Sequence, residues 1–230
     1  MTTSPLIAVL PGAREVHDAV AWLKAADARA CVVWGREGEA VPLGLPEHAT
    51  VPADTRAILD VSHAFDVFTR IGALAAVPQA AYARVGRDLW VPGVGDNWQQ
   101  VNTIEQAVAA LPSGVRVFAA TGRGSLSELA RHPGRVFLRQ LNTHREPTGF
   151  GNCEFVFGPA PLDAAGEADL LKRLEIDVVL ARNIGGPDAF PKVRAARDLG
   201  LPVVMLRPPG LPSGPRLRSA EQMADWLKTL

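Results

Sequence analysis

Short apolar runs rich in β-branched residues alternate along this chain with helical patterns, and glycine-rich turns separate the two. The clearest case is VRVFAATGRGS at 115–125, where a strand pattern stops at Thr121, Gly122 and Gly124. A helical pattern begins beyond Ser125. Regular strand-loop-helix alternation is typical of a parallel sheet covered by helices. We therefore predict an α/β fold with ligands at the carboxyl ends of the strands.

The turn at 121–125 is a candidate anion-binding site. A glycine turn before a helix directs backbone N–H groups and the positive end of the helix dipole at one place, and Arg123 adds a full charge. Ser125 and Glu128 have the S-x-x-E spacing of a capping box, which predicts a helix start. An ordinary turn that binds nothing explains the same residues, because short glycine motifs often match by chance.

The same patterns predict two Rossmann-like domains with mainly parallel sheets and a cleft between them. Residues 80–101 break the alternation, and residues 112–114 have the composition of a linker, so we expect domains at 1–112 and 113–230. Apolar runs predict strands at 6–10, 30–34, 57–61, 115–120, 136–141, 155–158, 176–181 and 202–206. Helical spacing predicts helices with a buried face at Val16, Ala19, Val20 and Leu23, and others ending near 76 or spanning 103–111, 125–130, 163–174, 190–199 and 219–230.

Composition excludes several classes of protein. Lys plus Arg and Asp plus Glu are both 24, so no net charge attracts nucleic acid or a membrane surface. No apolar run reaches the roughly 18 residues of a membrane helix, and the N-terminus lacks a basic region before its short apolar run. We expect a cytoplasmic protein without nucleic-acid or membrane partners. Cys31 and Cys153 have no metal-site or disulfide spacing, and we expect buried thiols.

Motifs for other chemistries are missing from the sequence. The first turn has no G-x-G-x-x-G, and the chain has no G-x-x-x-x-G-K-[ST], H-E-x-x-H or G-x-S-x-G. Phosphate-loop NTPases, zinc hydrolases and common serine hydrolases are therefore disfavoured.

Four stretches carry a family resemblance: ILDVSHAF at 58–65, RVFAATGRGSL at 116–126, FGPAPLDAAGEADLLKRLEIDVVLARNIGG at 157–186 and KVRAARDLGLPVVMLRPP at 192–209. The sequence resembles the precorrin-6A reductase family of cobalamin biosynthesis. That resemblance implies an oxidoreductase that transfers hydride from NADPH to a C=C bond of precorrin-6A and gives precorrin-6B. It also implies that the N-terminal domain binds the dinucleotide and the C-terminal domain binds the substrate.

The resemblance implies cofactor-binding residues in the N-terminal half. The G-G-T-x-E-A turn of the family appears here as residues 11–15, where one glycine and the glutamate remain, and its D-A-T-H-P-F appears as residues 60–65. His63 is the candidate proton donor, because imidazole titrates near neutrality, with a purely structural histidine as the alternative. The implied cofactor contacts are Gly12, Arg14, Glu15, Arg36, Asp60 and Ser62.

Substrate contacts are implied in the C-terminal half, where T-K-N-S-G-G of the family appears as residues 181–186. The substrate of the family carries many carboxylates, which cations at loops or strand ends could bind through charge-assisted pairs. The alternative for each cation, Arg139 and Arg207 included, is a solvated surface charge. Trp90 and Trp98 either cover the macrocycle or pack at the domain junction, and we expect His144 to be exposed. The implied substrate contacts are Thr121, Gly122, Arg123, Arg182, Asn183, Gly185, Gly186 and Lys192.

Two functions stay open. The first is the NADPH-dependent precorrin-6A reductase, acting beside other cobalamin-pathway enzymes. The second is a paralogue that has lost NADPH binding and binds or delivers a tetrapyrrole or corrinoid intermediate. The turn at 11–15 discriminates between them, because Pro11 has no N–H for a pyrophosphate.

Overall fold

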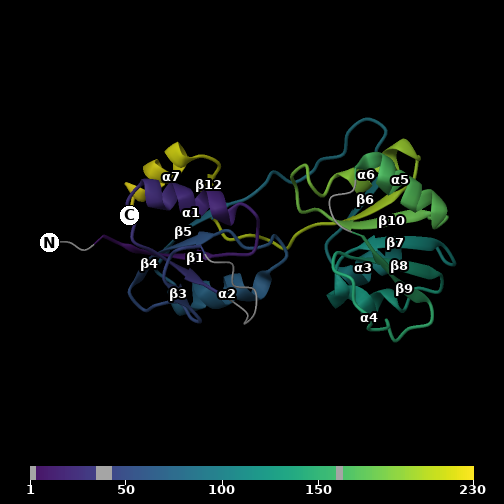
Figure 1. Ribbon diagram of the computed structural model, residues 1–230, viewed down its shortest axis with the longest axis horizontal. Coiled ribbons are helices and arrows are strands. Elements are labelled where there is room, and N and C mark those ends of the chain that lie inside the picture. The colour runs from purple at the N-terminus through teal and green to yellow at the C-terminus, as the bar shows by residue number, and fades with distance from the viewer. Residues whose placement is uncertain (1–3, 35–42, 159–162) are drawn as a thin grey trace. The chain divides into compact units, whose positions relative to one another are not determined.

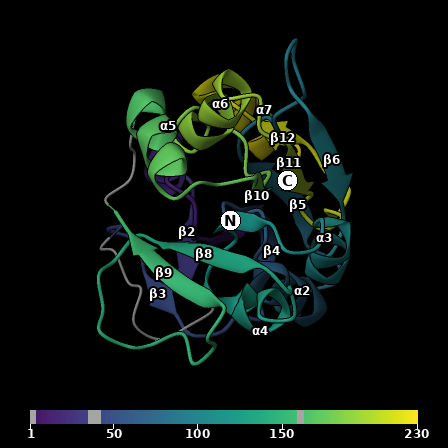
Figure 2. The ribbon, with the colours of Figure 1, turned by 90° about the vertical axis from the view of Figure 1, so that its right-hand side faces the viewer.

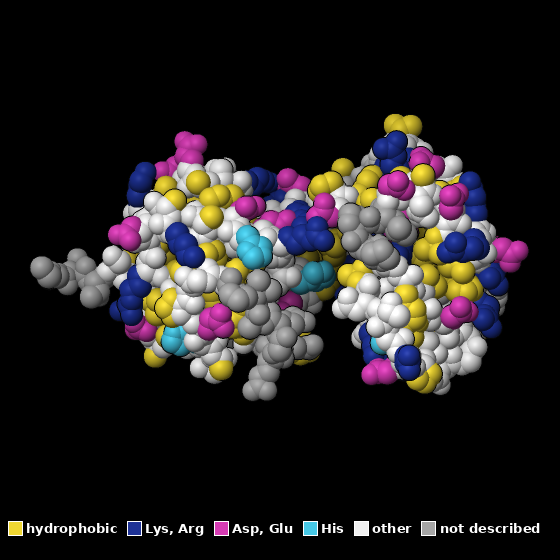
Figure 3. All heavy atoms as spheres, in the orientation of Figure 1, with side chains coloured by type: hydrophobic (Ala, Val, Ile, Leu, Met, Phe, Trp, Pro, Cys, Tyr) yellow, Lys and Arg dark blue, Asp and Glu magenta, His cyan; other side chains and the backbone are white. Residues whose placement is uncertain are grey.

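A computed structural model describes residues 4–34, 43–158 and 163–230 (Figure 1). The chain forms two compact units: unit 1 contains Met1–Gly86 and Pro209–Leu230, and unit 2 contains Arg87–Pro208. None of the helices in the described ranges has the length and apolar character of a membrane span. Side chains of both charge signs are interspersed on the face drawn in Figure 3, as expected for a net charge of zero.

The units do not divide at residue 113, where the sequence analysis placed the boundary. Residues 112–114 form a turn inside unit 2, and the C-terminal residues return to unit 1. A boundary read from local composition cannot detect this return, because the return depends on strand pairing between distant parts of the chain.

Unit 1 is built on a parallel sheet in the order β3-β2-β1-β4-β5-β12. This is the strand order of doubly wound dinucleotide-binding folds, with β12 in the sixth place. Leu10 pairs with Asp60, so β1 and β4 end side by side. The strands are β1 (Leu6–Leu10), β2 (Ala30–Val33), β3 (Glu47–His48), β4 (Thr55–Asp60), β5 (Ala81–Val85) and β12 (Arg216–Leu217), and the helices are α1 (Val16–Ala25), α2 (Val67–Ala76) and α7 (Ala220–Leu227).

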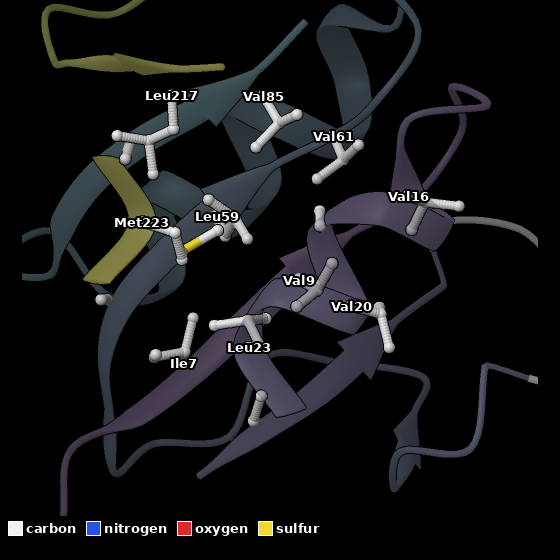
Figure 4. Close-up of a cluster of buried hydrophobic side chains, with 14 of the residues drawn as sticks. Ile7, Val9, Val16, Val20, Leu23, Leu59, Val61, Val85, Leu217 and Met223 are labelled. Carbon is white, nitrogen blue, oxygen red and sulfur yellow. The ribbon is translucent and has the colours of Figure 1, made fainter. Parts of the chain in front are cut away.

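The two faces of this sheet follow from side-chain alternation along β1. Ile7 and Val9 face one core, which α1 covers with its predicted residues Val16, Ala19, Val20 and Leu23 (Figure 4). Met223 and Trp226 of α7 complete that core. Leu6, Ala8 and Leu10 face a second core with Ala73 of α2. The end of the chain is therefore part of the unit that its beginning forms.

Unit 2 repeats this arrangement in the order β9-β8-β7-β10-β11-β6. Its sixth place belongs to β6, which precedes the other strands of the unit. Helices α5 and α6 cover one face of the sheet, and α3 and α4 lie on the other (Figure 2). The strands are β6 (Trp98–Val101), β7 (Arg116–Ala120), β8 (Arg135–Gln140), β9 (Cys153–Phe157), β10 (Val178–Arg182) and β11 (Val203–Leu206), and the helices are α3 (Ile104–Ala110), the short 3-10 helix η1 (Arg123–Ser125), α4 (Leu126–Leu129), α5 (Ala164–Arg173) and α6 (Pro191–Asp198).

Most predicted elements are confirmed, and every strand pairing in the described ranges is parallel. The strands β3, β5, β6 and β12 were not predicted. The strands β3 and β12 have only two residues each, and β6 exposes Gln99 and Gln100, so no apolar period marks these three. Cys31 and Cys153 are buried, as expected.

The first prediction concerns α7. Met223→Ala removes a fully buried side chain from the unit 1 core, and we expect it to lower the free energy of unfolding by about 2 to 5 kcal/mol. Urea denaturation measures the loss. Hydrogen exchange of the β1 and β4 amides should accelerate, and that of β7 and β10 should not. The exposed Ile71→Ala on α2 is the control, with a change below about 0.5 kcal/mol. Acceleration in unit 2 alone would contradict this assignment of α7.

Candidate functional site

The first candidate site lies where the connections from β1 and β4 diverge. In this strand order the crossovers from β1 and β4 leave in opposite directions, which opens a ligand position above the two carboxyl ends. Gly12 follows β1 with φ +145°, and a Cβ at Gly12 would lie 2.9 Å from the backbone nitrogen of His63 and 3.3 Å from Cα of Ser62. The amide of Ala13 donates to the carbonyl of Val61 at 2.9 Å. Only glycine therefore allows these two turns to approach.

The turn after Gly12 carries Arg14 and Glu15 to the start of α1. Glu15 occupies the N-cap position, but its side chain does not cap the helix. The amides of Val16 and His17 donate instead to the carbonyls of Ala13 and Arg14, at 3.2 and 3.4 Å. The exposed guanidinium of Arg14 is therefore the group of this turn that suits a phosphate. The adjoining Pro11 is buried and has no N–H. Arg36, the predicted contact at the far end of the cofactor, lies outside the described residues.

A buried polar network fixes the turn after β4. Asp60 accepts at Oδ1 from the amide and hydroxyl of Ser62, at 2.9 and 2.5 Å. It accepts at Oδ2 from Nε of Arg70 at 2.5 Å and from the hydroxyl of Tyr82 at 2.6 Å. Nη2 of Arg70 also donates to Oγ of Ser62 at 3.0 Å and to the carbonyl of His63 at 3.4 Å. The predicted cofactor residues Asp60 and Ser62 are thus bonded within the protein, where they hold the backbone of His63 against Gly12.

The electrostatics of this network keep Asp60 ionised. Burial raises the pKa of the Asp60 carboxyl, but hydrogen bonds from Ser62, Tyr82 and Arg70 together lower it below its ordinary value. Burial and the charge of Asp60 raise the pKa of Tyr82, so this hydroxyl remains a donor. Neither Arg70 nor Tyr82 was predicted from the sequence. Arg70 lies three residues before the buried Ala73 on α2, and an arginine on the apolar face of a predicted helix is a usable signal.

His63 is half-buried at the edge of this site. Its Nδ1 accepts from the amide of Phe65 at 3.2 Å. A neutral imidazole that accepts at Nδ1 carries its proton on Nε2. This hydrogen bond therefore fixes the neutral tautomer of His63 with its proton on Nε2.

The second candidate site lies at the equivalent place in unit 2, where β7 and β10 end. Thr121 is fully buried, and its hydroxyl bonds Oγ of Ser125 at 2.6 Å. Ser125 donates in turn to the carbonyl of Gly122 at 2.7 Å. The predicted capping box is wrong: Ser125 caps no helix N–H, and Glu128 accepts from Ser127. The reason is η1, which precedes α4 and turns the Ser125 hydroxyl back toward Gly122.

Two predicted substrate cations lie on these turns. The guanidinium of Arg182 covers Gly122, where a Cβ would lie 3.3 Å from Nη1. Burial lowers the pKa of Arg182. Arg123 is half-exposed, forms an ion pair with Glu146 and lies 5.7 Å from the centre of the Phe155 ring. Both cations therefore lie at the strand ends, but the structure also gives Arg123 an internal partner.

The glycine turn after β10 binds the chain's own segment 87–90. Asn183 accepts from the amide of Trp90 at 2.9 Å and donates to its carbonyl at 2.8 Å. The indole of Trp90 donates to the carbonyl of Gly186 at 2.7 Å. Gly185 has φ +70°, and a Cβ there would lie 2.2 Å from the carbonyl oxygen of Asp88. These three predicted substrate residues thus have a structural use, and Trp90 packs inside unit 2.

Three of the remaining candidates of unit 2, namely Lys192, Arg139 and His144, are more buried than the sequence suggested. Lys192 starts α6 and donates to the carbonyl of Ala189. Arg139 is buried rather than solvated. His144 is half-buried, not exposed, with its ring edgewise against Phe155 and Phe157 at 4.8 and 5.0 Å. Arg207 is exposed.

Two parallel sheets of the same doubly wound order, each with polar residues where the order reverses, define a protein of the Rossmann-like α/β class. The family model described as "Precorrin-6x reductase CbiJ/CobK" matches residues 46–228. The chain belongs to this family.

Similar proteins agree with this assignment. The precorrin-6A reductase of Rhodobacter capsulatus is 33% identical over 174 residues, which cover 74% of this chain and 69% of that protein. That of Sinorhizobium sp is 31% identical over 178 residues, which cover 74% and 68%. A solved structure of CobK precorrin-6A reductase matches with a TM-score of 0.80 at 28% identity and covers 98% of this chain and 96% of its own.

The buried ion pair of unit 1 gives a second prediction. Arg70→Leu leaves Asp60 buried without its cation, and we expect the free energy of unfolding to fall by about 3 to 5 kcal/mol. Urea denaturation at neutral pH measures the change. Arg56→Leu, at an exposed position on β4, is the control and should change it by less than about 0.5 kcal/mol. Equal effects of the two substitutions would contradict a structural role for the network.

A third prediction tests the structural use of Gly185. Gly185→Ala brings a Cβ against the backbone of Asp88 and strains a positive φ, so we expect a loss of more than about 1 kcal/mol of stability. Limited trypsin digestion should cut faster after Arg87. Gly124→Ala places its Cβ in open space at an ordinary φ and serves as the control. Unchanged cleavage would show that segment 87–90 does not depend on this glycine.

Proposed function

We propose that this protein is an NADPH-dependent reductase that converts precorrin-6A to precorrin-6B in cobalamin biosynthesis. One observation carries the proposal: the structural likeness to CobK precorrin-6A reductase extends over 98% of the chain, within a family whose model matches residues 46–228. The likeness includes β1 and α1, which precede the part that the family model matches.

Unit 1 is the candidate dinucleotide unit. NADPH supplies a hydride when bound, and the protein must hold it and exclude competing reactions. Gly12 gives the backbone room at the strand end, and the charge of Arg14 before α1 suits a phosphate. The hydrogen bonds from Arg70 to Ser62 and to the carbonyl of His63 hold in place the turn after β4, which packs against Gly12. In this assignment His63 delivers the proton that accompanies the hydride from its imidazolium form, which leaves a neutral imidazole.

Unit 2 is the candidate substrate unit. The family's substrate carries carboxylates, and the guanidinium of Arg182 at the end of β10 can pair with one of them. Gly122 leaves the space that this guanidinium occupies. Arg123 offers a second, more exposed cation, which would exchange Glu146 for a substrate carboxylate.

One observation favours a second function, a paralogue that binds or delivers a tetrapyrrole without NADPH. In the turn after β1, Pro11 has no N–H, and the amide of Ala13 is bonded to the carbonyl of Val61. Two backbone donors that a glycine turn could offer to a pyrophosphate are therefore missing there. Arg14 and the start of α1 are the groups that must compensate.

A calorimetric titration with NADPH separates the two functions. As the fourth prediction, we expect a Kd on the order of micromolar for NADPH and at least about tenfold weaker binding of NADH, followed by turnover of precorrin-6A under anaerobic conditions. Arg14→Gln should weaken NADPH binding, because a charged pair to phosphate is lost. Binding of precorrin-6A without detectable binding of either nucleotide would establish the paralogue instead.

A further inference from the structure

Helix α2 of unit 1 buries its charged residue and exposes its large apolar residues. Arg70 is the only charged residue among the ten of α2, and its side chain is 3% exposed. Phe68, by contrast, is 85% exposed, and Ile71 is 60% exposed. A helix that packs on a sheet normally buries its apolar stripe and leaves its charged residues in water. The helix α2 reverses this pattern.

The buried network around Asp60 explains the orientation of α2. Arg70 donates to the Asp60 carboxylate and to Oγ of Ser62, so the side of the helix that carries Arg70 faces inward. Residues three and four apart share one face of a helix. An exposed stripe without any charge therefore remains on the solvent side of α2, and it consists of Phe68, Ile71, Gly72 and Ala75.

The stripe begins at the candidate cofactor site. Phe68 is the second residue of α2, and α2 follows the turn after β4, so Phe68 lies toward the carboxyl end of the unit 1 sheet. The same turn carries His63, whose ring centre lies 6.0 Å from that of Phe65. The carboxylate of Asp66 accepts from the amide of Thr69 at 3.1 Å and thereby caps the helix.

The chemistry of hydride transfer requires the substrate to reach this part of unit 1. The donor and acceptor atoms of such a reaction approach to about 3 to 3.5 Å. If unit 1 holds the nicotinamide, the substrate ring must lie at the carboxyl end of the unit 1 sheet, whichever residues bind its carboxylates. The ring faces of a tetrapyrrole are apolar, and its carboxylates lie at the rim. An exposed apolar stripe without carboxylates suits such a face, because nothing on it repels the rim.

We propose that Phe68, extended by Ile71, is the surface of unit 1 on which the ring face of the tetrapyrrole substrate packs. The identity of the substrate as precorrin-6A rests on the proposed function above. The phenyl ring of Phe68 supplies apolar contact area and a flat face or edge for stacking. In this arrangement Phe68 sets the height of the macrocycle above the turn that carries His63, and so positions the carbon that receives the hydride.

Direct binding tests this contact without requiring turnover. Precorrin-6A is titrated anaerobically into the full-length protein without nucleotide, and Phe68→Ala is compared with the wild type. We expect about five- to fiftyfold weaker binding in the variant, because the apolar and stacking contact of the ring is lost. The affinity for NADPH and the midpoint of urea denaturation should stay the same, since the side chain of Phe68 is exposed.

Two further variants serve as controls. Phe68→Tyr keeps the flat ring and should restore binding to within about threefold of the wild type. Val94→Ala removes apolar surface from a residue that is 100% exposed but lies before β6, at the amino end of the unit 2 sheet. It should leave the affinity for precorrin-6A unchanged.

The outcomes separate this contact from the reaction. Equal affinity for precorrin-6A in the wild type and Phe68→Ala would overturn the contact even if turnover is normal. Weaker NADPH binding instead would assign Phe68 to the nicotinamide, and a lower urea midpoint would assign it to packing within the protein; either would overturn the proposal. Binding that depends on Phe68 without turnover would support the contact and establish the paralogue in place of the reductase. A wild type that does not bind precorrin-6A would overturn both.

Discussion

Parallel pairing of β1 with β4 and of β7 with β10 is the constraint on which both candidate sites depend. A parallel pair needs a crossover that leaves the sheet at its carboxyl end, and at these two pairs the crossovers leave in opposite directions. The turns after these four strands therefore lie at the carboxyl edge of each sheet, which is the usual ligand position of this fold. Nearly every residue that the family resemblance implies for binding lies in one of these turns or at the strand end before it.

The glycines in these turns make room for two kinds of group, either backbone or a side chain. Gly12 admits the turn after β4, and Gly185 admits the carbonyl of Asp88, so each makes room for the protein's own backbone. A glycine pattern in a sequence specifies that something approaches closely, but not whether that is a ligand or another segment. This is why Asn183 and Gly185 resembled ligand contacts in the sequence and proved to anchor segment 87–90. Gly122 differs, because it accommodates a cationic side chain rather than backbone.

Local periodicity in the sequence predicted most of the helices and strands. The features that it did not predict depend on pairing between distant parts of the chain. The face of α1 was predicted residue by residue, since its apolar positions recur at helical spacing and all four are buried. The placement of β12 and α7 in unit 1 depends on pairing Leu217 with Val85, and no local pattern encodes such a distant contact. The network around Asp60 was missed for the same reason: its partners Arg70 and Tyr82 lie ten and 22 residues away and come from a helix and another strand.

The two buried ion pairs, Asp60–Arg70 in unit 1 and Glu167–Arg139 in unit 2, differ in how many of their hydrogen-bonding groups find a partner. Asp60 in unit 1 accepts four hydrogen bonds, and its cation Arg70 also bonds Ser62 and the carbonyl of His63, so this network closes on the protein itself. Glu167 in unit 2 is engaged by one nitrogen of Arg139, while Nε of that arginine stays unbonded among the described residues. A buried polar network in which every group is hydrogen-bonded makes the surrounding structure rigid, and its charges need no ligand to balance them. A buried donor without a partner costs free energy, so the ion pair of unit 2 is less fully satisfied than that of unit 1.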